Sequence, residues 1–205
     1  EYDYFHLPEG SEFYVYSADT EHLFGAYSNI NNQEDYLFAT PLVKGDVIVL
    51  EYYEPYDAEF EGEIYLSEVI HDYRDIMGFF DGNNTDRLCG TNTHGGDELC
   101  PEAEPYELVI NATSWLDMGG FICSGSMLNN TAYDLKKYYM TAWHCTSGDN
   151  PSTFRFYFNY GAHNCASNGG SWGFGLYSSD QLATSNGMNS DWTLLEITHS
   201  NIPDE

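Results

Sequence analysis

The sequence predicts an all-β protein. The 205-residue chain contains 18 Tyr, 12 Phe and 19 Gly, and such a composition favours strands joined by turns, because aromatic side chains pack well on pleated sheets. Short runs in which apolar and polar residues alternate support the same class. The length allows one large domain or two ordinary ones, each able to bury its own core.

Residues 1–86 form the first predicted domain, a small β-sandwich. Several runs alternate as half-buried strands do, and turn residues such as Lys44 and Gly45 separate them. Nothing indicates a helix longer than a turn or two, so two small packed sheets are the simplest architecture. The predicted strands are Ser11–Tyr16, Tyr36–Thr40, Asp46–Tyr53 and Glu61–Val69. The polar segment Gly82–Thr85 lacks periodicity and marks the domain boundary.

Residues 87–205 form the second predicted domain, a small β-barrel with long loops. Cys89–Glu104 is Gly-rich and acidic, which predicts a loop held by its two cysteines. Asn164–Gly175 and Ser178–Ser190 are also predicted loops. The predicted strands are Tyr106–Ile110, Phe121–Leu128, Lys137–Thr141, Ser152–Tyr160 and Thr193–Ile197.

The strong negative charge limits the classes of partner. Asp and Glu number 33 and Lys and Arg only six, which gives a formal net charge of −27. Such a surface repels nucleic acids and anionic membranes, so neither is an expected partner. Solubility in an extracellular setting explains the acidity more simply than a specific acidic function does.

No cofactor is expected, although calcium stays an open alternative. Asp81, Asn83, Thr85 and Asp86 begin like a calcium-binding loop. Asp86, however, occupies the position at which the sharp turn needs Gly, and Asn92 replaces the bidentate Glu. A zinc site made by Cys89, His94 and Cys100 is a further alternative, but disulfide bonds explain these cysteines more simply.

Other features predict a secreted, extracellular, mature chain. No run has the length of a membrane-spanning helix and no signal peptide precedes Glu1. The sequons at Asn83, Asn111 and Asn129 are candidate glycosylation sites. Five cysteines fit an oxidising compartment, and their odd number leaves at least one thiol without a partner in this chain.

His144 and Asp191 are the candidate catalytic residues. His144 follows a predicted strand and Asp191 opens another. A general base needs an imidazole held in one tautomer, and a carboxylate that accepts a hydrogen bond from its other nitrogen supplies this. The alternatives are that His144 is a core histidine with a satisfied hydrogen bond and that Asp191 is a carboxylate at a strand start that caps a turn. Aromatic side chains such as Tyr52 and Tyr53 could stack on sugar rings, but core or edge packing is the commoner role.

Three blocks of sequence resemble the secreted bacterial lysyl endopeptidases, which are serine proteases of the trypsin fold. The blocks are CGTNTHGGDELCPE from Cys89, CSGSMLNNTAYDLKKYYMTAWHC from Cys123 and SDWTLLE from Ser190. They occur in the family's order and span residues 89–197. The resemblance implies that His144 is the general base and Asp191 its orienting carboxylate. It also implies that residues 87–205 are the N-terminal, six-stranded barrel of a trypsin-like double barrel.

A looser resemblance covers the first domain. The strings FATPLVKGDVIVLEYYEP and VIHDYR are similar to the β module that precedes the protease in some precursors of this family. This part carries no catalytic motif. Trp143 differs from the residue commonly found before the family's catalytic histidine, which affects the wall of the pocket and not the base.

The resemblance also implies the disulfide pattern. Cys123 would pair with Cys145 and fix the approach of the histidine, and Cys100 would pair with Cys165. Each such bond stabilises the fold by about 3 kcal/mol where its geometry is relaxed. Cys89 is then unpaired in this chain, because in the family its equivalent pairs with a cysteine of the second barrel.

The sequence contains no candidate nucleophile in the expected place. In the trypsin fold the serine follows the aspartate, yet only 14 residues follow Asp191 and no Gly-Asp-Ser-Gly occurs. Ser124, Ser126 and Ser171 all precede Asp191. We therefore expect that the second barrel, with its serine and oxyanion hole, is absent and that this chain alone is inactive.

Two functions follow from these expectations. The first is the N-terminal part of a secreted serine endopeptidase, acting on protein or peptide substrates once a second barrel is supplied. The alternative is a non-catalytic, secreted and glycosylated β protein of protease ancestry that binds a partner or self-assembles into a homo-oligomer or filament. This alternative is based on the apolar face that a missing second barrel would leave exposed to solvent.

Overall fold

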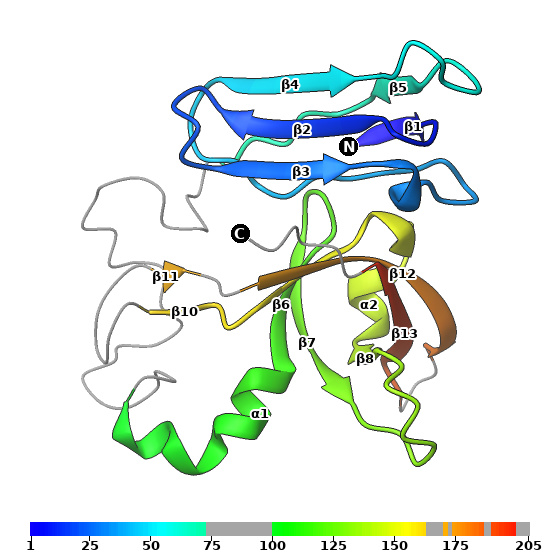
Figure 1. Ribbon diagram of the computed structural model, residues 1–205. Helices are drawn as coiled ribbons and strands as arrows, with labels where there is room; N and C mark the ends of the chain where they lie inside the picture. Colours follow the sequence, from blue (N-terminus) through cyan, green and yellow to red (C-terminus); the bar gives the residue numbers. More distant parts are fainter. Residues whose placement is uncertain (73–99, 163–169, 172–173, 187–189, 200–205) are drawn as a thin grey trace.

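The computed structural model describes residues 1–72, 100–162, 170–171, 174–186 and 190–199. They form two small N-terminal sheets and a closed β-barrel, with a few short helical segments between strands (Figure 1). The prediction of an all-β fold is confirmed. No helix among these residues has the length and apolar character needed to cross a membrane.

The N-terminal sheets enclose an aromatic core. Strand β2 (Glu12–Ser17) lies between β3 (Leu23–Tyr27) and β4 (Ile48–Tyr53), and β1 (Tyr2–His6) pairs with β5 (Glu63–Leu66). Burial alternates along β2, which turns one face of the strand toward the core. The buried side chains are Tyr2, Phe5, Leu7, Phe13, Val15, Phe24, Tyr27 and Phe38.

Six antiparallel strands close the barrel in the order β12, β13, β8, β7, β6 and β9. Their interior is filled by buried apolar side chains that include Leu116, Tyr139, Phe156 and Leu195. The bounds are β6 Thr113–Asp117, β7 Ile122–Leu128, β8 Tyr138–Thr141, β9 Arg155–Phe158, β12 Phe174–Ser185 and β13 Trp192–His199. The closed sheet leaves no unpaired strand edge within the barrel.

Short elements connect these strands. Two-residue strands β10 (Gly161–Ala162) and β11 (Gly170–Ser171) pair with each other. Helical turns occupy η1 (Asn29–Asn31), η3 (Pro101–Tyr106), α2 (Trp143–Thr146) and η4 (Pro151–Thr153). The longest described helix pair is η3 followed directly by α1 (Glu107–Ala112).

The prediction of a strand at Tyr106–Ile110 is wrong, because helix α1 covers most of that segment. A short apolar run fits a helix and a strand equally well when no partner is known. Pro101 stands in the first turn of the preceding η3, where its missing N–H costs nothing. The strand that enters the barrel is instead β6, directly after α1.

The predicted loop Ser178–Ser190 is also wrong over its first half, since β12 continues to Ser185. The side chains of residues 180–184 are exposed to solvent while the backbone of this part pairs with β13. Tyr36–Thr40, predicted as a strand, makes only a single bridge between Phe38 and Tyr2. A left-handed Tyr36, with φ of 60°, interrupts its extended backbone.

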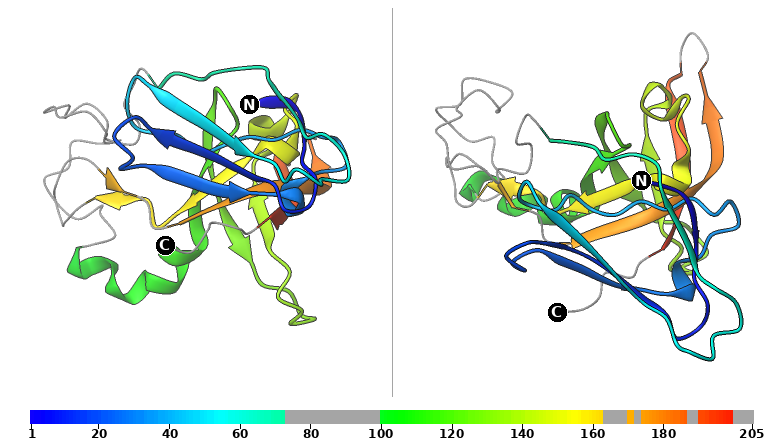
Figure 2. Two further views of the ribbon diagram at one scale, coloured as in Figure 1. Left: turned by 45° about the horizontal axis from the view of Figure 1, so that its top comes forward. Right: turned by 90° about the horizontal axis from the view of Figure 1, so that it is seen from above.

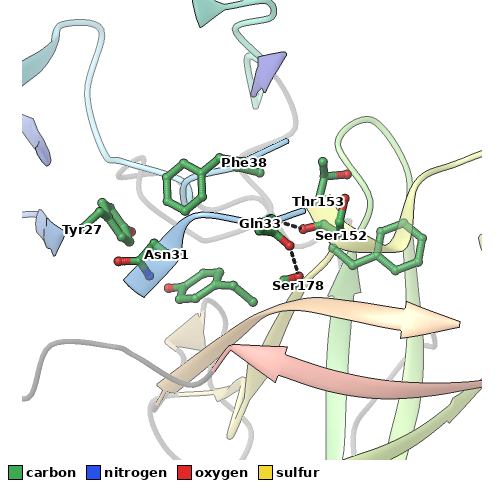
Figure 3. Close-up of a pocket in the computed structure, with 10 residues that line it drawn as sticks. Tyr27, Asn31, Gln33, Phe38, Ser152, Thr153 and Ser178 are labelled. Atoms are coloured by element: carbon green, nitrogen blue, oxygen red, sulfur yellow. Dashed lines mark hydrogen bonds between the residues drawn. The ribbon is translucent and has the colours of Figure 1, made fainter. Parts of the chain in front are cut away.

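The N-terminal sheets lie against one side of the barrel in all three views (Figures 1 and 2). Gln33 bridges the two parts, because its Nε2 donates to the carbonyl of Ser152 at 3.2 Å and its Oε1 accepts from Ser178 at 2.5 Å (Figure 3). The pocket around these side chains measures only about 10 Å³, room for at most one water molecule. The interface is therefore closed at this point.

Candidate catalytic site

The pairing of two strands brings His144 and Asp191 together. Thr141, the last residue of β8, lies opposite Thr193 near the start of β13. In an antiparallel pair, the chain leaving one strand meets the chain entering the other. The single helical turn α2 leaves β8 and carries His144, and Asp191 directly precedes β13. Two residues 47 positions apart thus become neighbours.

The Asp191 carboxylate takes two hydrogen bonds from His144. The ring Nδ1 lies 2.5 Å from Oδ2, and the backbone N–H donates to Oδ1 at 2.9 Å. An ionised carboxylate only accepts, so this contact fixes the proton of the neutral imidazole on Nδ1. Nε2 then presents its lone pair and has no hydrogen-bond partner among the described residues. This is the tautomer that a general base requires.

The charge state of the pair also fits this arrangement. The hydrogen bond from the His144 side chain, followed by the one from its backbone N–H, lowers the pKa of Asp191 below its ordinary value. The carboxylate is therefore ionised at neutral pH. The side chains are open to solvent, with 66% of His144 and 49% of Asp191 exposed, so a reacting group has access to the imidazole.

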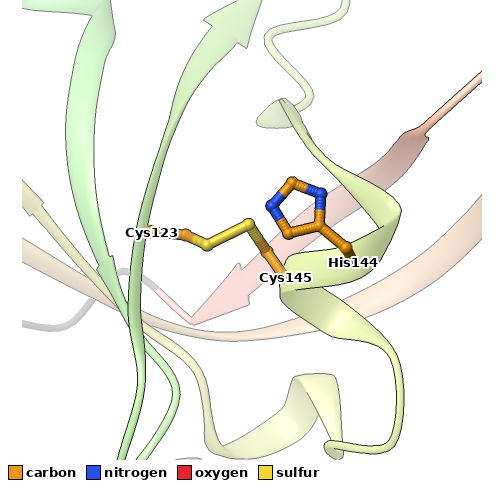
Figure 4. Close-up of side chains that lie close together, drawn as sticks. All are labelled: Cys123, His144 and Cys145. Atoms are coloured by element: carbon orange, nitrogen blue, oxygen red, sulfur yellow. A yellow bond between two sulfur atoms is a disulfide. The ribbon is translucent and has the colours of Figure 1, made fainter.

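A disulfide bond between Cys123 and Cys145 anchors the helical turn to β7. Cys145 follows His144 directly, and the histidine ring lies beside the two sulfur atoms (Figure 4). The potential ligand atoms of these three residues lie within 4.8 Å of one another. Both sulfurs are already bonded to each other, however, so they offer no thiolate to a metal ion.

Two threonines beneath the pair were not predicted from the sequence. Thr146, the last residue of α2, and Thr193 of β13 bring their side-chain oxygens within 2.9 Å. Each stands two residues after a member of the pair formed by His144 and Asp191. The sequence contains this shared spacing of two residues. It indicates a contact between the threonines only once the two segments are known to lie side by side.

The remaining predicted site residues have different placements. Asn111 lies in α1 and Asn129 follows β7, and both are exposed, as a glycan acceptor requires. Cys100 is buried and disulfide-bonded. Among the described contacts, none joins Ser124 or Ser126 to His144, and the side chain of Ser171 lies outside the described part of the structure. Cys89, Cys165, Asn83 and the candidate calcium and zinc ligands of 81–94 lie outside the described residues.

A comparison with protein families finds a match over the C-terminal part of the chain. The family model described as "Lysyl endopeptidase, C-terminal domain" matches residues 82–205. The match includes the whole barrel, both members of the histidine and aspartate pair, and the disulfide beside them. It covers more than half of the 205-residue chain. The chain therefore belongs to the lysyl endopeptidase family.

Proposed function

We propose that this chain provides the general base and its orienting carboxylate to a secreted serine endopeptidase of the trypsin type. The main support is the contact of 2.5 Å between Nδ1 of His144 and Oδ2 of Asp191. The rest of the imidazole is open to solvent. In this proposal residues 87–205 are the first barrel of a double barrel. The nucleophilic serine and the oxyanion hole come from a second barrel outside the 205 residues.

The proposed chemistry is peptide-bond hydrolysis. Nε2 of His144 takes the proton of a serine hydroxyl as that oxygen attacks the carbonyl carbon, and later returns a proton to the leaving amine. Asp191 stays ionised and stabilises the imidazolium that forms between these steps. The substrate is a protein or peptide whose scissile bond lies against the exposed side of the imidazole.

Labelling with a fluorophosphonate tests this proposal on the whole gene product. We expect one modified serine, outside residues 1–205, and hydrolysis of a peptide library. His144→Ala should lower kcat by about 10⁴-fold or more. His22→Ala, a histidine of the N-terminal module, serves as the matched control and should change nothing. A labelled serine within the 205 residues, absence of labelling, or hydrolysis that survives His144→Ala would each overturn the proposal.

We also propose secretion, and a boundary near residue 86 between the module and the barrel. The Cys123–Cys145 disulfide is stable only in an oxidising compartment, and two of the sequons are exposed. The family match begins at residue 82, close to that boundary. A secreted chain should carry glycan at these sequons, and the intact mass before and after glycosidase treatment measures this. The variants Asn111→Gln and Asn129→Gln show which of the two sites is occupied.

A second function, partner binding without catalysis, is favoured by the hairpin tip between β7 and β8. Tyr133 and Leu135 are 88% and 92% exposed there. Asn130 holds the tip by accepting from the backbone N–H groups of Ala132 and Tyr133. Exposed apolar side chains on an ordered loop resemble an interface anchor. Light scattering should then show association that Tyr133→Ser with Leu135→Ser abolishes; a monomer at high concentration counts against it.

A further inference from the structure

A chain of three threonine hydroxyls lies beneath the histidine and aspartate pair. Oγ1 of Thr193 is 2.9 Å from Oγ1 of Thr146 on one side and 2.9 Å from Oγ1 of Thr184, in β12, on the other. Thr193 is fully buried and Thr146 is 3% exposed. The three hydroxyls therefore link the helical turn α2 to two strands of the barrel. The contact between Thr146 and Thr193 is buried, whereas Thr184 at the outer end is exposed.

The hydroxyl contact repeats the spacing of the contact above it. His144 meets Asp191, and two residues further along both segments Thr146 meets Thr193. The two contacts form successive rungs between the same pieces of chain. The lower rung is buried and the upper one is exposed, so the lower rung is protected from competing hydrogen bonds with water.

Helix α2 needs such external support. It has four residues, and a single helical turn has no stability of its own. The His144 side chain is mostly exposed, so little packing holds it in place. The Cys123–Cys145 disulfide ties α2 to β7, which is not the strand that follows Asp191. The hydroxyl contact between Thr146 and Thr193 joins α2 to β13 itself.

We propose that Thr146 and Thr193 are positioning residues, whose buried hydrogen bond sets α2 at the distance from β13 at which Asp191 accepts from both the ring and the backbone of His144. They touch neither substrate nor reacting atoms and act through the imidazole and the carboxylate. The catalytic consequence rests on the proposed function, but the positioning itself is a property of this chain and is measurable in it.

The hydroxyls can be removed with little cost to the fold. Thr146 also lies 3.3 Å from the carbonyl of Trp143, and Thr184 lies 3.2 Å from the carbonyl of Trp192. Each outer hydroxyl therefore keeps an acceptor when the central one is lost. Thr193→Val has nearly the same shape and leaves no buried donor without a partner, so we expect it to fold.

Nuclear magnetic resonance of the 205-residue chain tests the proposal without any turnover. The first readout is the resonance of the Nδ1 proton of His144, and the second is the carbon-13 titration of the Asp191 carboxyl. Thr193→Ser should retain the wild-type resonance and the lowered pKa of Asp191. Thr193→Val should lose or broaden the resonance, and the pKa of Asp191 should rise toward its ordinary value of 3.8.

Two further variants keep the test decisive. Thr146→Val removes the same bond from the helix side and should give the same result if Thr193→Val does not fold. Ser114→Ala is the matched control: it deletes one partner of a buried hydroxyl pair, 2.7 Å from Oη of Tyr139, elsewhere in the barrel. The tyrosine keeps the carbonyl of Ser114 as an acceptor, at 3.5 Å.

Ser114→Ala should lower the melting temperature about as much as Thr193→Val does. It should leave the Nδ1 proton resonance of His144 and the titration of the Asp191 carboxyl unchanged. Wild-type behaviour of the folded valine variants, or an equal loss in Ser114→Ala, would overturn the inference. Failure of the proposed protease function appears separately, as an absence of labelling and hydrolysis in the wild-type gene product.

Discussion

Replacing Arg155 by Met should strongly destabilise the protein. The guanidinium is 5% exposed and lies at the seam between the barrel and the N-terminal sheets. Its Nε is 3.0 Å from Oδ2 of Asp117, at ion-pair distance although the N–H is not aimed at that oxygen. One terminal nitrogen donates to the carbonyl of Thr40 at 3.1 Å, and the other to the carboxylate of Glu1 at 3.2 Å.

The magnitude follows from what the substitution leaves behind. Burial alone would lower the pKa of Arg155, but the charges of Asp117 and Glu1 and the neighbouring Tyr157 outweigh it and raise the pKa. Without the cation, Asp117 stays buried, with 10% of its side chain exposed, and among the described residues only the backbone N–H of Gly119 donates to it, at 3.0 Å. Removing one partner of a buried ion pair costs about 3–5 kcal/mol. At roughly 2–4 °C per kcal/mol for a chain of this size, the melting temperature should fall by about 6–20 °C.

Urea unfolding followed by tryptophan fluorescence measures this effect. The control is Lys136→Met, which breaks a solvent-exposed ion pair of 3.0 Å with Glu196 and should change the free energy of unfolding far less than Arg155→Met does. Asp117→Asn added to Arg155→Met removes the stranded charge and should restore part of the loss. If Arg155→Met costs no more than the control, or if the second substitution deepens the loss, the reasoning about the buried charge is refuted.

Three further predictions concern the site and the barrel core. The pKa of Asp191 is lowered in the folded state, so its contribution to stability is complete above its ordinary pKa and is lost as the pH falls through the lowered value. The free energy of unfolding of Asp191→Asn should therefore fall less steeply with decreasing pH, below about pH 4, than that of the wild type. Replacing Cys123 and Cys145 together by Ala opens a loop with a sequence separation of 22 and should cost about 3 kcal/mol by loop-closure entropy, measured by urea unfolding; an unchanged midpoint would contradict this. Leu195→Ala, at a fully buried position, should cost about 2–5 kcal/mol, whereas Leu182→Ala, at a position 47% exposed, should cost well under 1 kcal/mol; similar losses would mean that the barrel core is misassigned.

Local patterns predicted several strands well. Three observed strands lie within their predicted ranges: Ile122–Leu128, Tyr138–Thr141 and Arg155–Phe158. β-branched and aromatic residues, with turn residues on either side, indicated them. Patterns failed where pairing partners decide the outcome. Phe174–Ser185 is polar over its second half and becomes a strand because it pairs with β13, while the apolar Tyr106–Ile110 has no strand partner and is largely helical.

In the candidate site, too, local sequence indicated some features and tertiary contacts decided others. The residue types at 144 and 191 were identifiable because a histidine beside a cysteine after one strand, and an aspartate before another, form compact local motifs. Their hydrogen bonds and their exposure depend on how α2 sits against β13. No local pattern encodes that distance.

The sequence by itself determined the all-β class, the acidic surface and the identity of the histidine, aspartate and cysteine residues of the site, since composition, periodicity and short motifs are properties of neighbouring residues. Only the tertiary structure decided the strand register that joins His144 to Asp191, the threonine contact beneath them and the partners of Arg155. These depend on segments far apart in the chain, whose packing free energy leaves only a faint trace in any local stretch of sequence.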